Sequence, residues 1–168
     1  GHLKALDGKV DIDDNSLYRH PSIEAFRDEI TENQLVLAAR KFDFLYIPIK
    51  DTGNIGVISN GSGMIMSSID LISKRGMEVT CALDLGGGAT ADRIKEALKI
   101  VASNPLVDTI FINIFGGITR CDEIANGVAH SIDHIDTNRL VIRLEGTNKE
   151  QGLQIIREMG GNIELVDG

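Results

Sequence analysis

Cysteine, proline and aromatic residues are scarce in this sequence of 168 residues, and tryptophan is absent. The two cysteines, Cys81 and Cys121, form no Cys-x-x-Cys pair and have no histidine at metal-ligand spacing, which excludes a zinc site or a disulfide framework. No apolar run approaches the ~18 residues of a membrane-spanning helix, and no signal peptide opens the chain. These absences favour a soluble protein of the cytoplasm or, in a eukaryote, of the mitochondrial matrix.

Basic residues are also in the minority, and the formal net charge is -8. A nucleic-acid-binding surface needs clustered Lys and Arg, so this balance argues against a nucleic acid as partner. An anionic ligand would have to be held locally, by a few well-placed groups. Apolar residues make up 42% and charged residues 25% of the chain, which is ordinary for a globular domain with a buried core.

The first forty residues differ from the rest of the chain. Gly1 and His2 are interpreted as a cloning remnant outside the fold. Asp7-Gly8-Lys9 predicts a hairpin-type turn, and Pro21 is typical of the start of a short helix, here extending to Phe26. A hairpin and one helix bury too little apolar surface to fold alone. Residues 3–40 are therefore expected to be the tail of a neighbouring domain, and residues 41–168 a domain of their own.

Within that second part, five short β-branched or apolar runs alternate with four segments of helical period. The predicted strands are Ile55–Ser59, Glu78–Leu83, Thr109–Ile114, Arg139–Leu144 and Asn162–Val166. The helix after the second strand has Ile94, Ala97, Leu98 and Val101 along one side. This alternation predicts an α/β fold with a doubly wound, parallel five-stranded sheet of strand order 2-1-3-4-5.

Glycine is concentrated in the turns that follow the first three predicted strands. These turns are Asn60–Gly63, Asp84–Gly88 and Phe115–Gly117. Glycine lets a backbone approach a ligand closely, and a helix N-terminus carries N–H groups and partial positive charge. In the expected strand order the first and third turns meet at the switch point of the sheet, where ligands of such folds bind. The second turn would border the site.

Other interpretations of these segments stay open. Gly61-Ser62-Gly63 begins like a dinucleotide-binding fingerprint, but Met66 stands where the third glycine would be, which makes NAD the weaker alternative. A glycine turn can also be a mere connection. Asp122 and Glu123 would compete with an anion for the following helix N-terminus, and Arg120 would offset them.

Three further local patterns have both structural and functional interpretations. Cys121 at a helix start could be a nucleophile, although no histidine stands in a partnering motif. His130 and His134 have the i, i+4 spacing of a metal-binding pair but lack a third ligand. Thr147-Asn148-Lys149-Glu150 predicts a capping box at the last helix.

Several motifs together resemble one family. They are Asp7–Lys9, Asp14–Arg19, Gly53–Gly56, Asn60–Met64, Leu83–Thr90, Asn113–Asp122 and Arg143–Asn148. In order and spacing they are similar to succinyl-CoA synthetase beta subunits over nearly the whole chain. The resemblance implies the end of an ATP-grasp domain followed by most of a flavodoxin-like domain. It also implies a ligase that forms ADP or GDP, with Mg²⁺, ATP or GTP and CoA bound by the intact enzyme.

The resemblance extends to individual residues. Asn60, Gly116, Gly117, Ile118 and Thr119 match positions that contact succinate or phosphate where the beta subunit meets the alpha subunit. Asp7 matches an acid that binds Mg²⁺, a hard cation suited to carboxylate oxygen.

The phosphorylated histidine belongs to the alpha subunit, so we expect no catalytic residue in this chain and no ligase activity from it alone. A malate–CoA ligase, a citrate-lyase-type subunit and a non-catalytic nucleotide-binding interaction module remain alternatives.

Overall fold

The computed structural model describes residues 2–27, 32–135 and 139–166. The chain divides into two compact units, residues 1–32 and 33–168. Residues 2–13 of the first unit form neither helix nor strand, so the predicted hairpin-type turn is wrong there; Asp7 only accepts a hydrogen bond from the N–H of Gly8 through its Oδ1, at 2.7 Å. The short helices α1 (Asp14–Leu17) and α2 (Pro21–Glu24) follow, and Pro21 opens α2 as expected.

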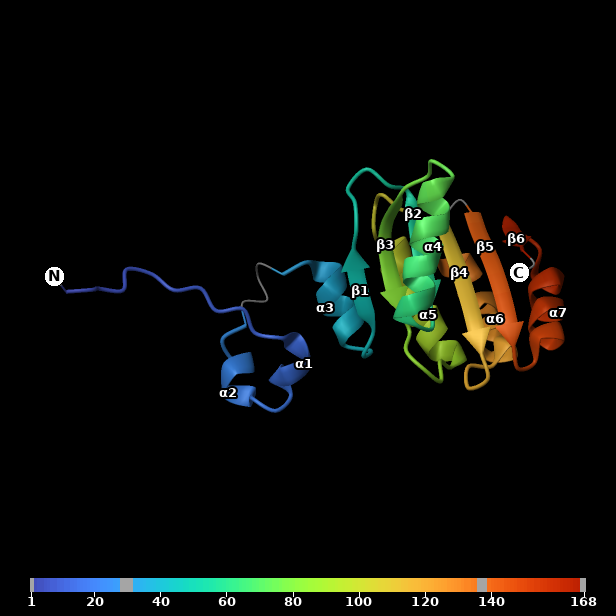
Figure 1. Cartoon of the computed structure of the whole chain (residues 1–168). Helices are drawn as coiled ribbons and strands as arrows, with labels where there is room; N and C mark the ends of the chain where they lie inside the picture. The colour runs from blue at the N-terminus through green and yellow to red at the C-terminus, as the bar shows by residue number, and fades with distance from the viewer. Residues whose placement is uncertain (1, 28–31, 136–138, 167–168) are drawn as a thin grey trace. The chain divides into compact units, whose positions relative to one another are not determined.

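The second unit is one sheet covered by helices on both faces (Figure 1). Its elements are α3 (Gln34–Arg40), β1 (Leu45–Pro48), β2 (Ile55–Ser59), α4 (Ser62–Lys74), β3 (Val79–Asp84), α5 (Ala91–Ala102), β4 (Thr109–Gly116), α6 (Cys121–Ala129), the 3-10 turn η1 (Ile132–His134), β5 (Arg139–Gly146), α7 (Lys149–Met159) and β6 (Ile163–Leu165). Helix α3, within residues 3–40, belongs to this unit; its N-cap Asn33 accepts from the N–H groups of Leu35 and Val36.

The sheet order is β1-β3-β2-β4-β5-β6. Strands β2 to β6 are the five predicted strands, and they are parallel in the predicted order 2-1-3-4-5. The prediction of five strands is wrong by one, because β1 pairs antiparallel with the outer side of β3. A four-residue run that ends in Pro48 has a weak strand signal, and an edge position is where proline is tolerated.

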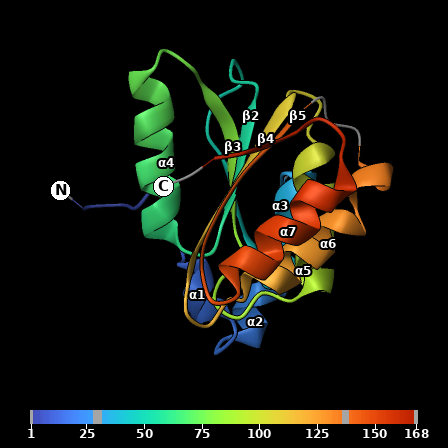
Figure 2. The same cartoon turned by 90° about the vertical axis from the view of Figure 1, so that its right-hand side faces the viewer.

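The two faces of the sheet are covered unequally. Helix α4 lies on one face, while α3, α5, α6 and α7 lie on the other (Figure 2). The larger core is on the four-helix side, and the predicted stripe of α5 is buried in it, with Ile94, Ala97, Leu98 and Val101 all at 0% exposure. A smaller cluster beneath α4 contains Val57, Ile65 and Ala82. Apolar burial on both faces is what a parallel sheet requires.

Candidate functional site

The three glycine-rich turns lie at the carboxyl edge of the parallel strands. Strands β2 and β4 are neighbours, paired from Ile55↔Thr109 to Ser59↔Asn113. The chain leaves β2 into α4 on one face and leaves β4 into α6 on the other (Figure 2). The predicted switch point is therefore confirmed, and the turns 60–61 and 117–120 meet there.

Asn60 connects these two turns through its side-chain amide. Its Oδ1 accepts a hydrogen bond from the N–H of Phe115 at 3.1 Å, and its Nδ2 donates to the carbonyl of Phe115 at 2.8 Å. The same Nδ2 lies 3.4 Å from Oγ1 of Thr119. Asn60 therefore holds the end of β4 in place. Its amide oxygen retains a second lone pair with which it can accept from a ligand.

The four predicted residues of the third turn differ in accessibility. A Cβ added to Gly116 would lie 3.3 Å from Nδ2 of Asn60, whereas a Cβ on Gly117 would meet nothing within 4 Å. The side chain of Ile118 is 83% exposed, but Thr119 is buried at 1%. Gly117 and Ile118 therefore form the outer part of the turn, and the Thr119 hydroxyl lies beneath it. The structure brings all of these residues together with Asn60; that they bind a ligand remains a prediction.

The second glycine turn borders the site, as the strand order predicts. Asp84, the last residue of β3, accepts from the Ser62 hydroxyl at 2.7 Å and from the N–H of Gly86 at 2.9 Å. A Cβ on Gly88 would lie 3.9 Å from Cγ2 of Ile118. Asp84 thus ties the second turn to the first. No local pattern predicts this bond, because Ser62 and Asp84 are 22 residues apart in the chain.

The two helices that start at the switch point differ in electrostatics. Helix α4 begins after Gly61 with no side-chain cap and no acidic residue in its first turn. Helix α6 carries Asp122 and Glu123 in its first turn, and the N–H of Cys121 already donates to the carbonyl of Thr147 at 2.9 Å. The N-terminus of α4 is therefore free of acidic residues of its own, and the nearby carboxylate of Asp84 is bonded to its first residue, Ser62.

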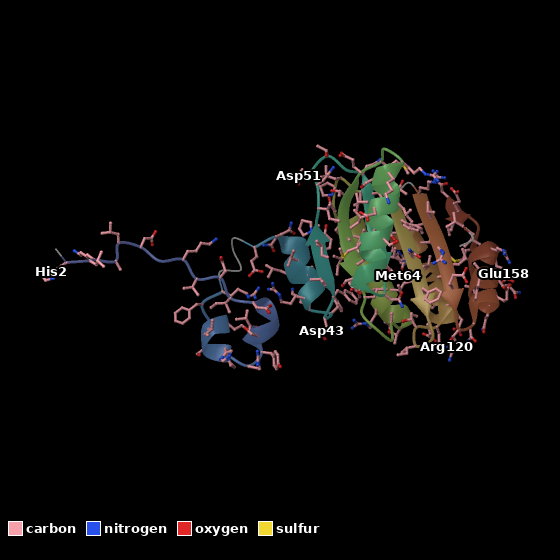
Figure 3. The ribbon with its side chains drawn as sticks, in the orientation of Figure 1. His2, Asp43, Asp51, Met64, Arg120 and Glu158 are labelled. Atoms are coloured by element: carbon pink, nitrogen blue, oxygen red, sulfur yellow. The ribbon has the colours of Figure 1, made fainter. Side chains whose placement is uncertain are left out.

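Arg120 offsets the acidic start of α6, as expected. Its Nη2 lies 2.6 Å from Oδ2 of Asp122, and its Nε donates to Oδ1 at 3.1 Å. This pairing with Arg120, helped by Asn148, lowers the pKa of Asp122 to about 2. Glu123 accepts instead from the N–H of Ala91 at the start of α5, at 3.3 Å. Figure 3 shows Arg120 at the carboxyl edge, at the opposite end of the sheet from Asp51.

The thiol of Cys121 is not suited to be a nucleophile. Its side chain is fully buried, and burial, followed by the charge of Asp122, raises its pKa. A thiol with a raised pKa stays protonated near neutral pH, so the thiolate needed for attack is depleted.

The described residues contain no group of three His, Cys, Asp or Glu side chains that could hold a metal ion, which leaves His130 and His134 without a third ligand. Asp7 is exposed and lies in the first unit, apart from any such group. One carboxylate does not form a magnesium site by itself.

The turn between β5 and α7 contacts the third glycine turn, and the predicted capping box is wrong. Asn148, with a left-handed backbone (φ 59°), is the N-cap of α7, and its side chain makes no cap hydrogen bond. The Thr147 hydroxyl donates to the carbonyl of Gly117 at 3.0 Å. A tertiary contact thus uses the hydroxyl that the local pattern assigned to the helix.

Comparison with known proteins places this geometry in a family. The CoA-ligase family model matches residues 58–165, which include all three glycine turns. The chain is 49% identical over 168 residues to the beta subunit of an ADP-forming succinate–CoA ligase from Paracoccus denitrificans (strain Pd 1222), and 46% identical to that of Nitrobacter hamburgensis. Each alignment covers 99% of this chain and 42% of the relative, so the chain spans about two fifths of their length.

A solved structure agrees on the fold. The ATP citrate lyase of Methanothrix soehngenii, solved in complex with citrate and coenzyme A, superposes with a TM-score of 0.77 over 93% of this chain and 49% of the lyase chain. Its sequence identity is 16%, so the likeness concerns the fold alone. In the described residues of our chain, no helix has the length and apolar character to cross a membrane. On the match of its glycine turns and sheet, the chain belongs to the CoA-ligase family.

Proposed function

We propose that this chain is the C-terminal part of the beta subunit of a succinate–CoA ligase that forms a nucleoside diphosphate. The observation that carries this proposal is the 49% identity over 99% of the chain to such a subunit. The switch-point geometry supports it, because Asn60 and the outer part of the 116–119 turn converge at the positive end of α4. In this assignment residues 3–40 are the end of an ATP-grasp domain and residues 41–168 the flavodoxin-like domain.

In this proposal the site binds anions before and after a phosphoryl transfer: succinate and the phosphoryl group before it, and succinyl phosphate after it. An oxygen of succinate attacks the phosphorus of a phosphohistidine supplied by the alpha subunit; the N–P bond breaks, the ring nitrogen takes up a proton, and succinyl phosphate and neutral histidine form. The thiol sulfur of CoA then attacks the acyl carbon, the C–O bond to the phosphate breaks, and inorganic phosphate leaves with the thiol proton. Backbone N–H groups at Gly117 and Ile118 suit this task, since they stabilise a dianionic phosphoryl group and cannot be titrated. The Nδ2 group of Asn60 can donate to the substrate carboxylate in place of its long contact, 3.4 Å, with the Thr119 hydroxyl.

The intact subunit would also use ATP or GTP and Mg²⁺, with Asp7 as one of the magnesium ligands, in the cytoplasm or a mitochondrial matrix. None of the described residues completes a metal site with Asp7. Because the phosphohistidine is supplied by the alpha subunit, the 168-residue chain alone is expected to form no detectable succinyl-CoA from succinate, ATP and CoA. Turnover by the purified chain without the alpha subunit would overturn that expectation.

The test of the proposed function uses the full-length subunit assembled with its alpha partner. Assays with succinate, malate and citrate should show turnover with succinate. Asn60→Ala and Gly117→Pro should each raise the KM for succinate or phosphate roughly tenfold or more, because one removes the bonds to Phe115 and the other an N–H donor. Asn104→Ala is the control, since Asn104 also bonds through its amide, to the Tyr46 hydroxyl, at the other end of the sheet. Wild-type kinetics in both site variants would reject the site assignment.

A further inference from the structure

The segment Gly146-Thr147-Asn148 contacts the third glycine turn at both of its ends. The N–H of Thr147 donates to the carbonyl of Gly116 at 3.3 Å, and its hydroxyl donates to the carbonyl of Gly117 at 3.0 Å. At the far end of the turn, the N–H of Cys121 donates to the carbonyl of Thr147 at 2.9 Å. Thr147 therefore bonds to the backbone on both sides of the exposed part of the turn.

The backbone around this segment is packed closely enough to hold Thr147 in a fixed position against the third glycine turn. A Cβ on Gly146 would lie 2.0 Å from the carbonyl oxygen of Gly116, and a Cβ on Gly152 would lie 2.7 Å from that of Cys121. The Asn148 side chain also lies near Asp122 and helps to lower the pKa of that carboxyl group. The start of α7 and the turn before α6 are thus packed backbone to backbone.

These bonds determine which way the peptide groups of the turn face. In a trans peptide the carbonyl of one residue and the N–H of the next point in opposite directions, and the described peptide bonds are all trans. The carbonyls of Gly116 and Gly117 are directed at Thr147. The N–H groups of Gly117 and Ile118 are therefore directed away from Thr147, out of the exposed side of the turn. Successive N–H groups that face the same side form an anion-binding concavity.

We infer that Thr147 is a positioning residue, which keeps the Gly117 and Ile118 N–H groups turned toward the anionic ligand. This inference deepens the proposed function and rests on it. Without the hydroxyl, the peptide group between Gly117 and Ile118 loses the bond that fixes its carbonyl. A flipped peptide would present a carbonyl oxygen to the anion in place of an N–H, and the ligand would be repelled.

The experiment compares Thr147→Val with Thr147→Ser in the full-length subunit assembled with its alpha partner. Valine keeps the shape and removes the hydroxyl, whereas serine keeps the hydroxyl. The KM for inorganic phosphate, measured in the direction that consumes succinyl-CoA, should rise by about three- to tenfold in Thr147→Val, as expected for the loss of one hydrogen bond. The value of kcat should change less than KM, and Thr147→Ser should restore the wild-type KM.

Thr80→Val is the matched control. The buried Thr80 hydroxyl also donates to a backbone carbonyl, that of Lys50, at 2.7 Å, but it lies near the amino end of β3. The Thr80→Val variant should be less stable than wild type but should have an unchanged KM for phosphate. An equal rise of KM in Thr80→Val would show a general structural effect and overturn the inference, as would an unchanged KM in Thr147→Val.

The outcomes separate the inference from the proposed function. If Asn60→Ala impairs the ligase and Thr147→Val does not, the positioning role fails and the site stands. If neither variant has an effect, the site assignment fails as well. A measurement on the wild-type complex needs no variant to fold: inorganic phosphate should slow amide hydrogen exchange in the peptide that contains Gly117 and Ile118. Unchanged exchange at saturating phosphate would overturn the inference by itself.

Discussion

Among single residues, the site depends on positions whose backbone conformation tolerates few other side chains. Gly146 has a positive φ of 123°, which side chains rarely adopt, and the carbonyl of Gly116 occupies the space of its missing Cβ. Asn148 adopts a left-handed backbone, which asparagine tolerates better than most residues. These two residues shape the turn whose middle residue, Thr147, contacts Gly116, Gly117 and Cys121.

Gly146→Ala should lower the free energy of unfolding by about 3 kcal/mol or more, because backbone strain and a clash with the Gly116 carbonyl add together. Gly76→Ala is the control: Gly76 also has a positive φ, of 75°, but a Cβ there meets nothing within 4 Å. It should cost only the strain, about 1 kcal/mol. Urea unfolding of both variants measures the difference, and equal losses would contradict the role of the close contact.

The carboxylate of Asp122 should make stability depend on acid pH. Arg120 and Asn148 hold its pKa at about 2, below the ordinary value of 3.8. A pKa that is lower in the folded state stabilises the protein above the unfolded-state pKa, and this stabilisation is lost as the pH falls from about 4 to about 2. Asp122→Asn should therefore be less stable than wild type near neutral pH, with a difference that shrinks toward about pH 2. Urea unfolding across this range checks it; a constant difference would show that the carboxylate charge is not involved.

At the scale of elements, the helices contribute unequally to the fold and to the site. Helix α5 has a fully buried stripe on the four-helix face, whereas α4 is alone on its face and keeps Leu71 62% exposed. The close approach of α5 and α6 is possible because a Cβ on Gly127 would lie 2.5 Å from the carbonyl of Ala91. This contact joins the start of α5 to the end of α6, and the bond from the N–H of Ala91 to Glu123 joins the two helix starts.

Leu98→Ala in α5 should cost about 2–5 kcal/mol, since a fully buried leucine leaves a cavity in a packed core. Leu71→Ala in α4 removes the same atoms from a largely exposed site and should change stability by less than about 0.5 kcal/mol. Chemical denaturation of the two variants compares the faces of the sheet directly. Similar losses would mean that the burial of α5 does not decide its contribution.

At the scale of the whole molecule, both hydrophobic clusters consist of residues from the second unit. Residues 33–168 should therefore fold without residues 1–32 and unfold cooperatively, with a midpoint within about 2 °C of the full chain. Calorimetry of the two chains tests this. A shift of about 10 °C or the loss of cooperativity would show that the first unit stabilises the second.

Sequence patterns correctly predict the alternation of strands and helices, the order of the five parallel strands and the convergence of the first and third turns. Hydrophobic periodicity and glycine positions are local signals, and the right-handed crossover of parallel strands leaves few topologies open. The motifs also led to the correct family. Strand β1 is not predicted, because its four residues end in Pro48 and resemble a loop until β3 provides a partner.

The contacts of the polar side chains in the site depend on the packed fold and could not be predicted from local sequence. Asn60 bonds to Phe115, which is 55 residues away, and Thr147 bonds to Gly117 at a separation of 30. A local pattern assigned the Thr147 hydroxyl to its own helix, yet this hydroxyl crosses to another turn. The family resemblance placed Thr119 among the ligand contacts, and its side chain is buried beneath the turn. A hydroxyl or amide bonds to whichever acceptor the packed fold brings within reach, and that acceptor is not encoded in its sequence neighbours.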